Sequence, residues 1–456
     1  MGSELIAAAA TAWGRSAVGI LRLSGDAAAD CAGAVFSPAD GRPLRDHPPG
    51  RLVYGTLRDR EGRAVVKVLG TWSQAPRSYT GEETAELQCH GSPMVLTLAL
   101  EALFAQGARQ ALPGEFTRRA FLNGKLDLTQ AEAVMDLIDA ETPAGARVAA
   151  GQLSGELSRR VEEVYEGLVD VMAHFHAVLD YPDEELDPFT MKTVGKALTG
   201  AEEGLRALLA TYDRGRRLTK GIPCAIVGLP NAGKSSLLNA LVGYERAIVT
   251  EIPGTTRDTV EERCVLGGVL LHLIDTAGLR ETEDRVERLG VERSRRAMEQ
   301  AELILVVVDR STGLTGEALA LAQEAISLAP TLVLYNKCDL PPADIPRPLP
   351  AFPGELEISA KLGLGLEALG QAVAGLFSQG GGEAGGELLT NARQAEAAGR
   401  ALEAVRRAQA SLEAGVTPDA LLTDAEEALS ALGELTGKTV REDVTNRIFQ
   451  RFCVGK

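Results

Sequence analysis

The sequence lacks the features that would place the protein in a membrane or hold it together with disulfide bonds or zinc. No run of eighteen apolar residues occurs among its 456 residues, and its start lacks the basic and long apolar regions of a signal peptide. Its six cysteines show no CxxC spacing and its five histidines form no ligand cluster. We therefore expect a soluble, cytoplasmic protein with reduced thiols and no membrane contact.

Net positive charge is also missing. The chain has 47 Lys and Arg residues against 63 Asp and Glu residues, which gives a formal net charge of −16. This surplus works against broad binding of a phosphate backbone, so contact with nucleic acid requires a local basic patch or a partner. Arg118 and Arg119 form such a local pair, although a solvated pair on a turn is the simpler interpretation.

A phosphate-binding motif is the most informative feature that is present. The stretch GLPNAGKSS at 228 to 236 fits the P-loop pattern and follows an apolar, strand-like run. Gly233 allows backbone N–H groups to approach the phosphates. Lys234 would reach the β- and γ-phosphates and Ser235 would hold Mg²⁺, while a helix starting near Ser236 would point its positive end at the anion.

Three further motifs follow in order and select GTP. DTAG at 275 to 278 comes after an apolar strand, which suits a carboxylate at Asp275 that orders Mg²⁺. NKCD at 336 to 339 places Asp339 where its carboxylate can accept hydrogen bonds from the ring N–H and the amine of guanine, neither of which adenine offers. SAK at 359 to 361 can present a backbone N–H to the guanine carbonyl.

The group that orients the attacking water is not evident from the motifs. Leu279 stands where Ras-like proteins have a Gln. The acidic residues downstream either replace that Gln or form a solvated charged face, and they are Glu281, Glu283, Asp284 and Glu287. The loop at 249 to 258 is the natural first switch, with Thr255 and Thr256 as candidates for the second protein ligand of Mg²⁺.

The remaining sequence predicts a multidomain protein of mixed α/β and α structure. Short β-like runs alternate with helical stretches up to about residue 118, which indicates an N-terminal α+β domain. Helical periodicity before and after the GTPase motifs predicts a discontinuous helical domain with an inserted Ras-like P-loop GTPase domain. The predicted boundaries are 1–118, 119–215, 216–379 and 380–456.

Four stretches together resemble the tRNA-modification GTPases of the MnmE (TrmE) family. They are the GTPase motifs within 228 to 290, GEFTRRAFLNGKLDLTQAEAV at 114 to 134, DYPDEE at 180 to 185 and the terminal CVGK at 453 to 456. The resemblance implies a GTP hydrolase that forms a homodimer, and a heterotetramer with a flavoprotein of the MnmG (GidA) type, which carries the FAD. It implies modification of carbon five of the wobble uridine of certain tRNAs with a one-carbon unit from a tetrahydrofolate derivative.

The resemblance also assigns roles to residues. It implies K⁺ bound by Asn231 and the carbonyls of Thr250, Ile252 and Thr255, Mg²⁺ bound by Ser235 and Thr256, and folate bound by Arg22, Glu86, Lys125 and Lys456. Glu287 becomes the water-orienting carboxylate, Lys234 a second catalytic group, and Cys453 a thiol of a catalytic pocket. Arg257, Asp258 and Arg280 are expected at the contact between two GTPase domains or in a switch. The full GTP-binding set is Asn231, Ala232, Gly233, Lys234, Ser235, Ser236, Thr250, Glu251, Ile252, Pro253, Gly254, Thr255, Thr256, Asp275, Thr276, Ala277, Gly278, Asn336, Lys337, Asp339, Ser359, Ala360 and Lys361.

Two other functions fit the GTPase motifs. An RNA-binding ribosome-assembly GTPase would normally carry a basic RNA-binding module beyond the GTPase domain, whereas this chain ends in an Ala- and Glu-rich helical segment. A pure interaction switch would hydrolyse GTP but bind no folate.

Overall fold

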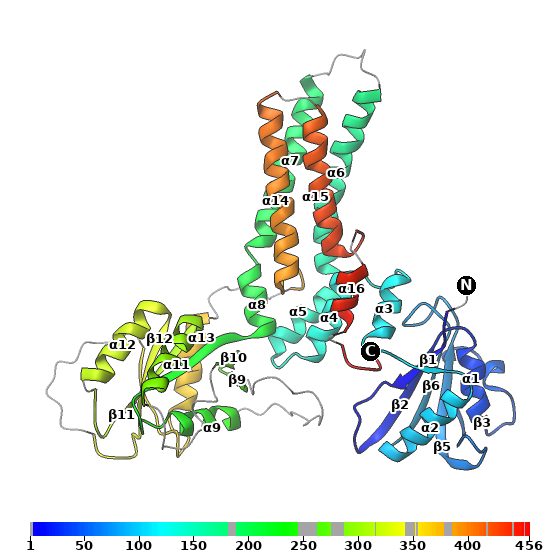
Figure 1. Ribbon diagram of the computed structural model, residues 1–456, viewed down its shortest axis with the longest axis horizontal. Helices are drawn as coiled ribbons and strands as arrows, with labels where there is room; N and C mark the ends of the chain where they lie inside the picture. The colour runs from blue at the N-terminus through cyan, green and yellow to red at the C-terminus, as the bar shows by residue number, and fades with distance from the viewer. Residues whose placement is uncertain are drawn as a thin grey trace. The chain divides into compact units, whose positions relative to one another are not determined.

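The computed structural model describes residues 3–180, 188–244, 262–274, 287–314, 316–342, 352, 354–377, 385–415, 418–439, 442–450 and 452–456. The chain divides into two compact units (Figure 1). The first unit comprises Met1–Met135, Gln152–Arg206 and Glu396–Lys456, and the second comprises Asp136–Gly151 and Ala207–Ala395. Among the described residues, no helix has the length and apolar character needed to cross a membrane.

The first unit contains a seven-stranded sheet in the order β3-β4-β5-β6-β2-β1-β7. Its strands are β1 (Ile6–Ala9), β2 (Ser16–Ser24), β3 (Phe36–Pro38), β4 (Val53–Arg58), β5 (Ala64–Ser73), β6 (Thr84–Gly91) and β7 (Arg109–Gln110). Neighbouring strands are antiparallel except β1 and β7. A short 3-10 helix at Leu44–Asp46 joins β3 to β4.

Alternation along the strands determines which side chains face the core. Leu21 and Leu23 of β2 pack with Leu87 of β6 beneath α1 (Ala28–Val35) and α2 (Pro93–Ala105), because successive side chains of a strand point to opposite faces. Arg22 and Glu86 occupy the intervening positions and are direct partners in the β2–β6 register. The sequence pattern thus places both charged residues on the face of the sheet away from α1 and α2.

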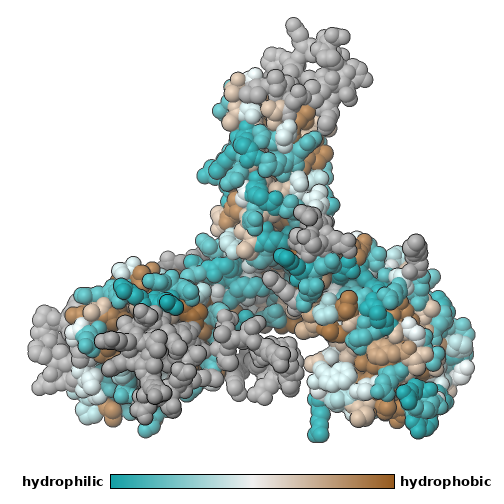
Figure 2. All heavy atoms as spheres, viewed as in Figure 1, coloured by the Kyte–Doolittle hydropathy of each residue, from teal (hydrophilic) through white to brown (hydrophobic). Residues whose placement is uncertain are grey.

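Long helices make up much of the rest of the first unit. They are α4 (Leu128–Ile138), α6 (Glu156–Asp180), α7 (Pro188–Leu209), α14 (Ala392–Glu413), α15 (Pro418–Thr436) and α16 (Glu442–Phe449), and α6, α7, α14 and α15 run alongside one another (Figure 1). Leu157, Val161, Val164, Leu168 and Val171 of α6 are buried, and their spacing of three or four residues lines one side of the helix. Hydrophilic residues cover much of the outer surface of these helices in the view of Figure 2.

The C-terminal peptide packs on the start of α3 (Glu115–Leu122). Pro113 and Val454 form an antiparallel bridge, and the Phe116 N–H donates to the Lys456 carbonyl at 3.1 Å. Gly455 has a φ of +99°, and a Cβ there would lie 2.0 Å from the Ala9 carbonyl oxygen. Only glycine therefore fits at this position, where the chain end passes directly over β1.

The environment of Arg119 differs from the predicted solvated pair on a turn. Its side chain is only 12% exposed and donates to Glu82 and Glu115, both at 2.9 Å. It lies within α3, so it is not part of a solvated pair on a turn. The pattern of charges could not reveal this, because Glu82 lies on a distant segment of the chain.

The second unit contains a six-stranded sheet in the order β13-β12-β11-β8-β10-β9. Its strands are β8 (Ile222–Gly228), β9 (Glu262–Leu266), β10 (Val269–Leu273), β11 (Leu303–Asp309), β12 (Thr331–Asn336) and β13 (Glu355–Glu357). The helices that accompany them are α5 (Pro143–Leu153), α8 (Tyr212–Lys220), α9 (Lys234–Tyr244), α11 (Glu287–Gln300), α12 (Gly316–Leu328) and α13 (Leu366–Phe377). All strand pairs are parallel except β9 with β10.

Helices cover both faces of this second sheet, as expected for parallel strands. Cys224 and Ile226 of β8 pack in a core with residues of α9 and α13, whereas Ala225 and Val227 face a core that includes residues of α11 and α12. The strand order reverses at β8, and ligands bind at such switch points beyond the carboxyl ends of the strands.

The buried charge at Glu115 generates a prediction about acid stability. Burial acts to raise its pKa, but hydrogen bonds from Arg109, the Leu112 N–H and Arg119 outweigh burial and lower the pKa to about 2. Because the folded-state pKa is depressed, the ionised group stabilises the fold above the unfolded pKa of about 4.5, and this contribution is lost as the pH falls toward about 2. Glu115→Gln should lower the free energy of unfolding by about 2–3 kcal/mol at pH 7.

Tryptophan fluorescence during denaturant unfolding measures this effect, because Trp13 and Trp72, the only two tryptophans, both lie in the first unit. The difference between wild type and Glu115→Gln should shrink between pH 5 and pH 2. Glu101→Gln, at an exposed position on α2, is the matched control and should change little. A constant difference at every pH would show that ionisation of Glu115 is not the stabilising feature.

Candidate functional site: a guanine nucleotide site and a separate cavity

The P-loop joins β8 to α9 in the second unit. The helix begins at Lys234, two residues earlier than the sequence predicts, so its N–H groups lie next to the loop that would hold phosphates. The Lys234 ammonium donates to the carbonyls of Gly228 and Leu229, both at 2.9 Å, and burial lowers the pKa of Lys234. Among the residues that the structure describes, the partners of this ammonium are neutral carbonyls of the loop itself, so the cation can turn to phosphate oxygens without breaking an ion pair.

The Asn336 side chain holds the P-loop to the base-binding loop. Asn336 is 2% exposed; its amide donates to the Ala232 carbonyl at 2.9 Å and accepts from the Ala360 N–H at 3.0 Å. Gly233, with a φ of +98°, makes room for it, because a Cβ there would lie 2.1 Å from the Asn336 amide nitrogen. Three of the sequence motifs therefore meet at one buried amide.

Lys337 makes a second connection to the P-loop. Its ammonium donates to the Asn231 carbonyl at 2.9 Å and to Asp309, at the end of β11, at 2.6 Å. Burial acts to raise the pKa of Asp309, but hydrogen bonds from Lys337 and Ser311 outweigh it and lower the pKa. The ion pair thus stays charged near neutral pH and supports Asn231, which has a left-handed φ of 60° and an exposed side chain.

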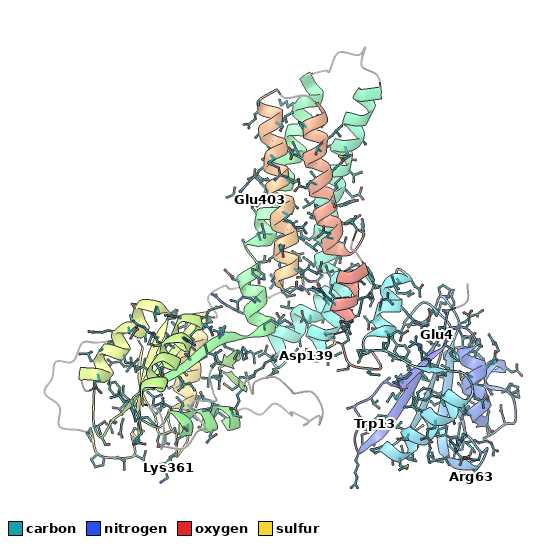
Figure 3. All side chains as sticks on the ribbon, viewed as in Figure 1. Glu4, Trp13, Arg63, Asp139, Lys361 and Glu403 are labelled. Atoms are coloured by element: carbon teal, nitrogen blue, oxygen red, sulfur yellow. The ribbon has the colours of Figure 1, made fainter. Side chains whose placement is uncertain are left out.

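Asp339 is oriented by Ser359. The Ser359 hydroxyl donates to one carboxylate oxygen of Asp339 at 2.7 Å, and Ser359 itself is buried. This hydrogen bond lowers the pKa of Asp339, and the charges of Lys361 and Lys337 act in the same direction. An ionised, exposed carboxylate with one oxygen fixed in this way can accept the two adjacent N–H groups of guanine. Lys361, labelled in Figure 3, is exposed and follows Ser359 by two residues.

Several predicted site residues lie outside the described residues. They are the switch residues Thr250, Glu251, Ile252, Pro253, Gly254, Thr255 and Thr256, the DTAG residues Asp275, Thr276, Ala277 and Gly278, and Arg257, Asp258, Arg280, Glu281, Glu283 and Asp284. Glu287 is the first residue of α11. Ser235 and Ser236 lie in the first turn of α9, and among the described residues no group of three or more His, Cys, Asp or Glu side chains could hold a metal ion.

A cavity of about 150 Å³ lies on the first sheet. Arg22 and Glu86 line it, and the Arg22 guanidinium donates to the Glu86 carboxylate at 2.9 Å. The other lining residues are Thr71, Trp72, Ser73, Tyr79, Thr84 and Ala85. Thr71 of β5 is the register partner of Glu86, so the three strands β5, β6 and β2 present Thr71, Glu86 and Arg22 in one row. The cavity can offer a ligand both a carboxylate and a guanidinium.

The other two predicted folate-binding residues lie near this cavity but do not line it. The Lys125 ammonium donates to the Pro76 carbonyl at 3.2 Å, in the loop at residues 74–83 that also carries Tyr79. Lys456 is held through its carbonyl by the N–H of Phe116, whose ring lies 5.9 Å from the Arg22 guanidinium. Cys453 is exposed and its carbonyl accepts from the Gly114 N–H at 3.3 Å.

Three residues around this cavity were not predicted from the sequence: Tyr79, Thr71 and Phe116. Phe116 falls within the block at 114 to 134 that carries the family resemblance, which was a usable signal. Thr71 could have been found from strand pairing with Glu86, but only once the register was known. Tyr79 lies in a loop with no pattern, so nothing in the sequence marks it.

The Asp339–Ser359 geometry predicts a change of base preference. Asp339→Asn should weaken GTP binding about 100-fold and improve binding of xanthosine triphosphate, because an amide can donate to the xanthine carbonyl where the carboxylate only accepts. Ser359→Ala should cost less, about tenfold, since it only frees the carboxylate to rotate. Binding of both nucleotides by fluorescence titration measures this, and unchanged GTP affinity in Asp339→Asn would remove Asp339 from the base-binding site.

Comparisons with known proteins match nearly the whole chain to one family. A model of the MnmE helical domain matches residues 128–453, and a model of the N-terminus of the GTP-binding protein TrmE matches residues 5–125. The tRNA modification GTPase MnmE of Alkaliphilus metalliredigens is 43% identical over 458 residues, which cover 99% of both chains. Its counterpart in Akkermansia muciniphila is 45% identical over 453 residues, covering 99% of this chain and 98% of that protein.

A third relative, the tRNA modification GTPase MnmE of Symbiobacterium thermophilum, is 44% identical over 459 residues that cover 100% of both chains. None of these three names favours the alternative of a ribosome-assembly GTPase. Because the similarity extends over the whole length of these relatives and two family models together span nearly the whole chain, the protein belongs to the MnmE family of tRNA modification GTPases and is a GTP hydrolase of tRNA modification.

Proposed function

We propose that this chain is a K⁺-dependent GTPase that modifies carbon five of the wobble uridine of certain tRNAs in the cytoplasm. It would act with a flavin-containing partner of the MnmG (GidA) type and use the one-carbon unit of a tetrahydrofolate derivative. The observation that carries this proposal is the cavity with its Arg22–Glu86 pair, present in the same chain as a guanine nucleotide site. A pure interaction switch would not need such a cavity.

The chemistry of the cavity fits a folate. The amino-pyrimidine edge of a pterin presents adjacent N–H donors, which a carboxylate such as Glu86 can accept. The glutamate tail carries carboxylates, for which Arg22, Lys125 and Lys456 supply cations on the same unit. The C-terminal peptide lies next to this region through its hydrogen bond to Phe116, which supports a role for Cys453 close to the bound folate.

Glu86 generates a test of the folate proposal. Glu86→Gln should raise the Kd for tetrahydrofolate at least tenfold, because one acceptor oxygen becomes an NH2 donor that opposes the N–H groups of the pterin, and Arg22 loses its charged partner. GTP hydrolysis should be unchanged, since Glu86 lies in the other unit. In a strain that lacks the protein, wild type should restore the modified wobble uridine and Glu86→Gln should not. Wild-type tetrahydrofolate binding by Glu86→Gln would refute the assignment.

The K⁺ proposal rests on Asn231. Its carbonyl is fixed by Lys337 and its side chain is exposed beside the phosphate-binding loop. A monovalent cation bound there along the phosphates would offset charge that develops in the transition state, as an arginine does in other GTPases. We propose Thr250, Ile252 and Thr255 as further K⁺ ligands and Ser235 and Thr256 as Mg²⁺ ligands.

Hydrolysis should therefore require K⁺ and be nearly absent in Na⁺, because the smaller ion does not match a cage of one side chain and three carbonyls. Release of phosphate, measured in matched KCl and NaCl buffers, tests this. Asn231→Lys should weaken the dependence on K⁺ by supplying a tethered charge. Equal turnover in both salts would contradict a K⁺ site.

Glu287→Ala is the companion variant for this assay. As the proposed water-orienting group at the start of α11, Glu287 acts mainly in the transition state. Its loss should lower hydrolysis in K⁺ about 100-fold and leave GTP affinity nearly intact. A wild-type rate would return Glu287 to the interpretation as a solvated charge.

We also propose that the predicted domain boundaries describe functional parts, with residues 1–118 forming a homodimer. Exposed apolar side chains on this part support it: Trp13 and Val18 are each 49% exposed and Met94 is 65% exposed. Trp13 lies in the β1–β2 connection (Figure 3), and hydrophobic residues are prominent over this part of the surface in Figure 2. Sedimentation of the full chain as a monomer at micromolar concentration would refute the dimer.

A further inference from the structure

The Arg22 guanidinium in the cavity lies close to two aromatic rings. Its central carbon is 5.4 Å from the centroid of the Tyr79 ring and 5.9 Å from that of the Phe116 ring. Both distances fall within the range in which a cation is attracted to an aromatic face. The positions of the two rings, together with the hydrogen bond to Glu86, therefore fix where Arg22 presents its charge.

Two consecutive residues of α3 control both rings. Phe116 is fully buried against Ile6, Ala8 and Ala111, so its ring cannot move independently of the sheet. Thr117 is also fully buried. Its hydroxyl is hydrogen-bonded to the Tyr79 hydroxyl at 2.9 Å. The first turn of α3 thus supplies one ring and restrains the other.

Further contacts from α3 and the residues after it hold the loop that carries Tyr79. Arg119 donates to Glu82 at 2.9 Å, the Asn123 amide donates to the Thr80 carbonyl at 2.7 Å, and Lys125 donates to the Pro76 carbonyl at 3.2 Å. Ser24 of β2 donates to the same carboxylate of Glu82 at 2.7 Å. With the Thr117–Tyr79 contact, the loop is therefore held at Pro76, Tyr79, Thr80 and Glu82. Of these contacts, the one from Thr117 reaches the side chain whose ring lies near Arg22.

We infer that Thr117 is a positioning residue for the ligand of this cavity, and that Arg119 assists it by fixing the loop. The Thr117 hydroxyl holds Tyr79 over Arg22, and Arg22 in turn binds the ligand. This inference rests on the proposed binding of a folate in the cavity. It also gives a physical role to the block at 114 to 134, whose first turn binds the C-terminal peptide through the Phe116 N–H and the cavity loop through the Thr117 hydroxyl.

A double-mutant cycle on the full-length chain tests the inference, with tetrahydrofolate as the probe and equilibrium dialysis as the measurement. Thr117→Val is nearly isosteric and removes the hydroxyl, and should raise the Kd about fivefold. Tyr79→Phe keeps the ring and should have the same effect. The double variant should be no worse than either single one, because both changes remove the same hydrogen bond. Thr117→Ser should restore wild-type affinity.

The controls separate this role from general stability. Thr97→Val removes a hydroxyl that bonds the Pro93 carbonyl in α2 and should leave the Kd unchanged. GTP hydrolysis of all variants should match wild type, and so should the tryptophan-monitored unfolding of Thr117→Val, because Tyr79 is 37% exposed and water can satisfy its hydroxyl. Tyr79→Phe leaves the fully buried Thr117 hydroxyl without this partner and should lower the free energy of unfolding, a loss that the double variant relieves. If Thr117→Val fails to fold, Tyr79→Phe and Thr117→Ser still test the contact.

Unchanged affinity in both Thr117→Val and Tyr79→Phe, or additive effects in the double variant, would overturn the inference while leaving the folate proposal intact. Failure of the wild-type protein to bind tetrahydrofolate would instead refute the proposed function, and the positioning role of Thr117 with it.

Discussion

The buried amide of Asn336 is the interaction on which the nucleotide site depends. A primary amide that is removed from water must find partners for both its donor and its acceptor. Without them, the free energy of desolvating the amide is not offset and the fold is less stable. Here the partners are the Ala232 carbonyl of the P-loop and the Ala360 N–H of the base-binding loop. The phosphate-binding and base-binding halves of the site are therefore held at one spacing, which suits a ligand that must contact both.

This arrangement constrains the residues around it. Gly233 must lack a side chain because the Asn336 amide occupies the place of its Cβ. Lys337, the next residue, has a left-handed φ of 64° and reaches back to the P-loop, so two adjacent residues at the end of β12 both support the loop after β8. The ion pair of Lys337 with Asp309 offsets the strain of that backbone conformation.

In the first unit, α3 has the corresponding role. Its first turn carries the carboxylate of Glu115, whose partners Arg109 and Arg119 come from β7 and from the next turn of the helix. A buried carboxylate with several charge-assisted hydrogen bonds fixes the orientation of the helix more strongly than exposed ion pairs could. Because the C-terminal peptide and the cavity loop both bind to this helix, their positions depend on the same few contacts.

The sequence by itself predicted the guanine nucleotide site, because its chemistry resides in short motifs whose backbone geometry is local. Gly233, Lys234 and Asp339 were predicted from spacing alone, and the apolar runs before them correctly predicted β8 and β12. Strand alternation was also sufficient to put Arg22 and Glu86 on one face, once β2 and β6 are paired.

Only the tertiary structure decided the surroundings of the cavity. The partners of Thr117 and Arg119 lie 38 and 37 residues away along the chain, and Gly455 passes over β1 at the other end of the sequence. Such contacts follow from how distant segments pack, and no local pattern of residues encodes them.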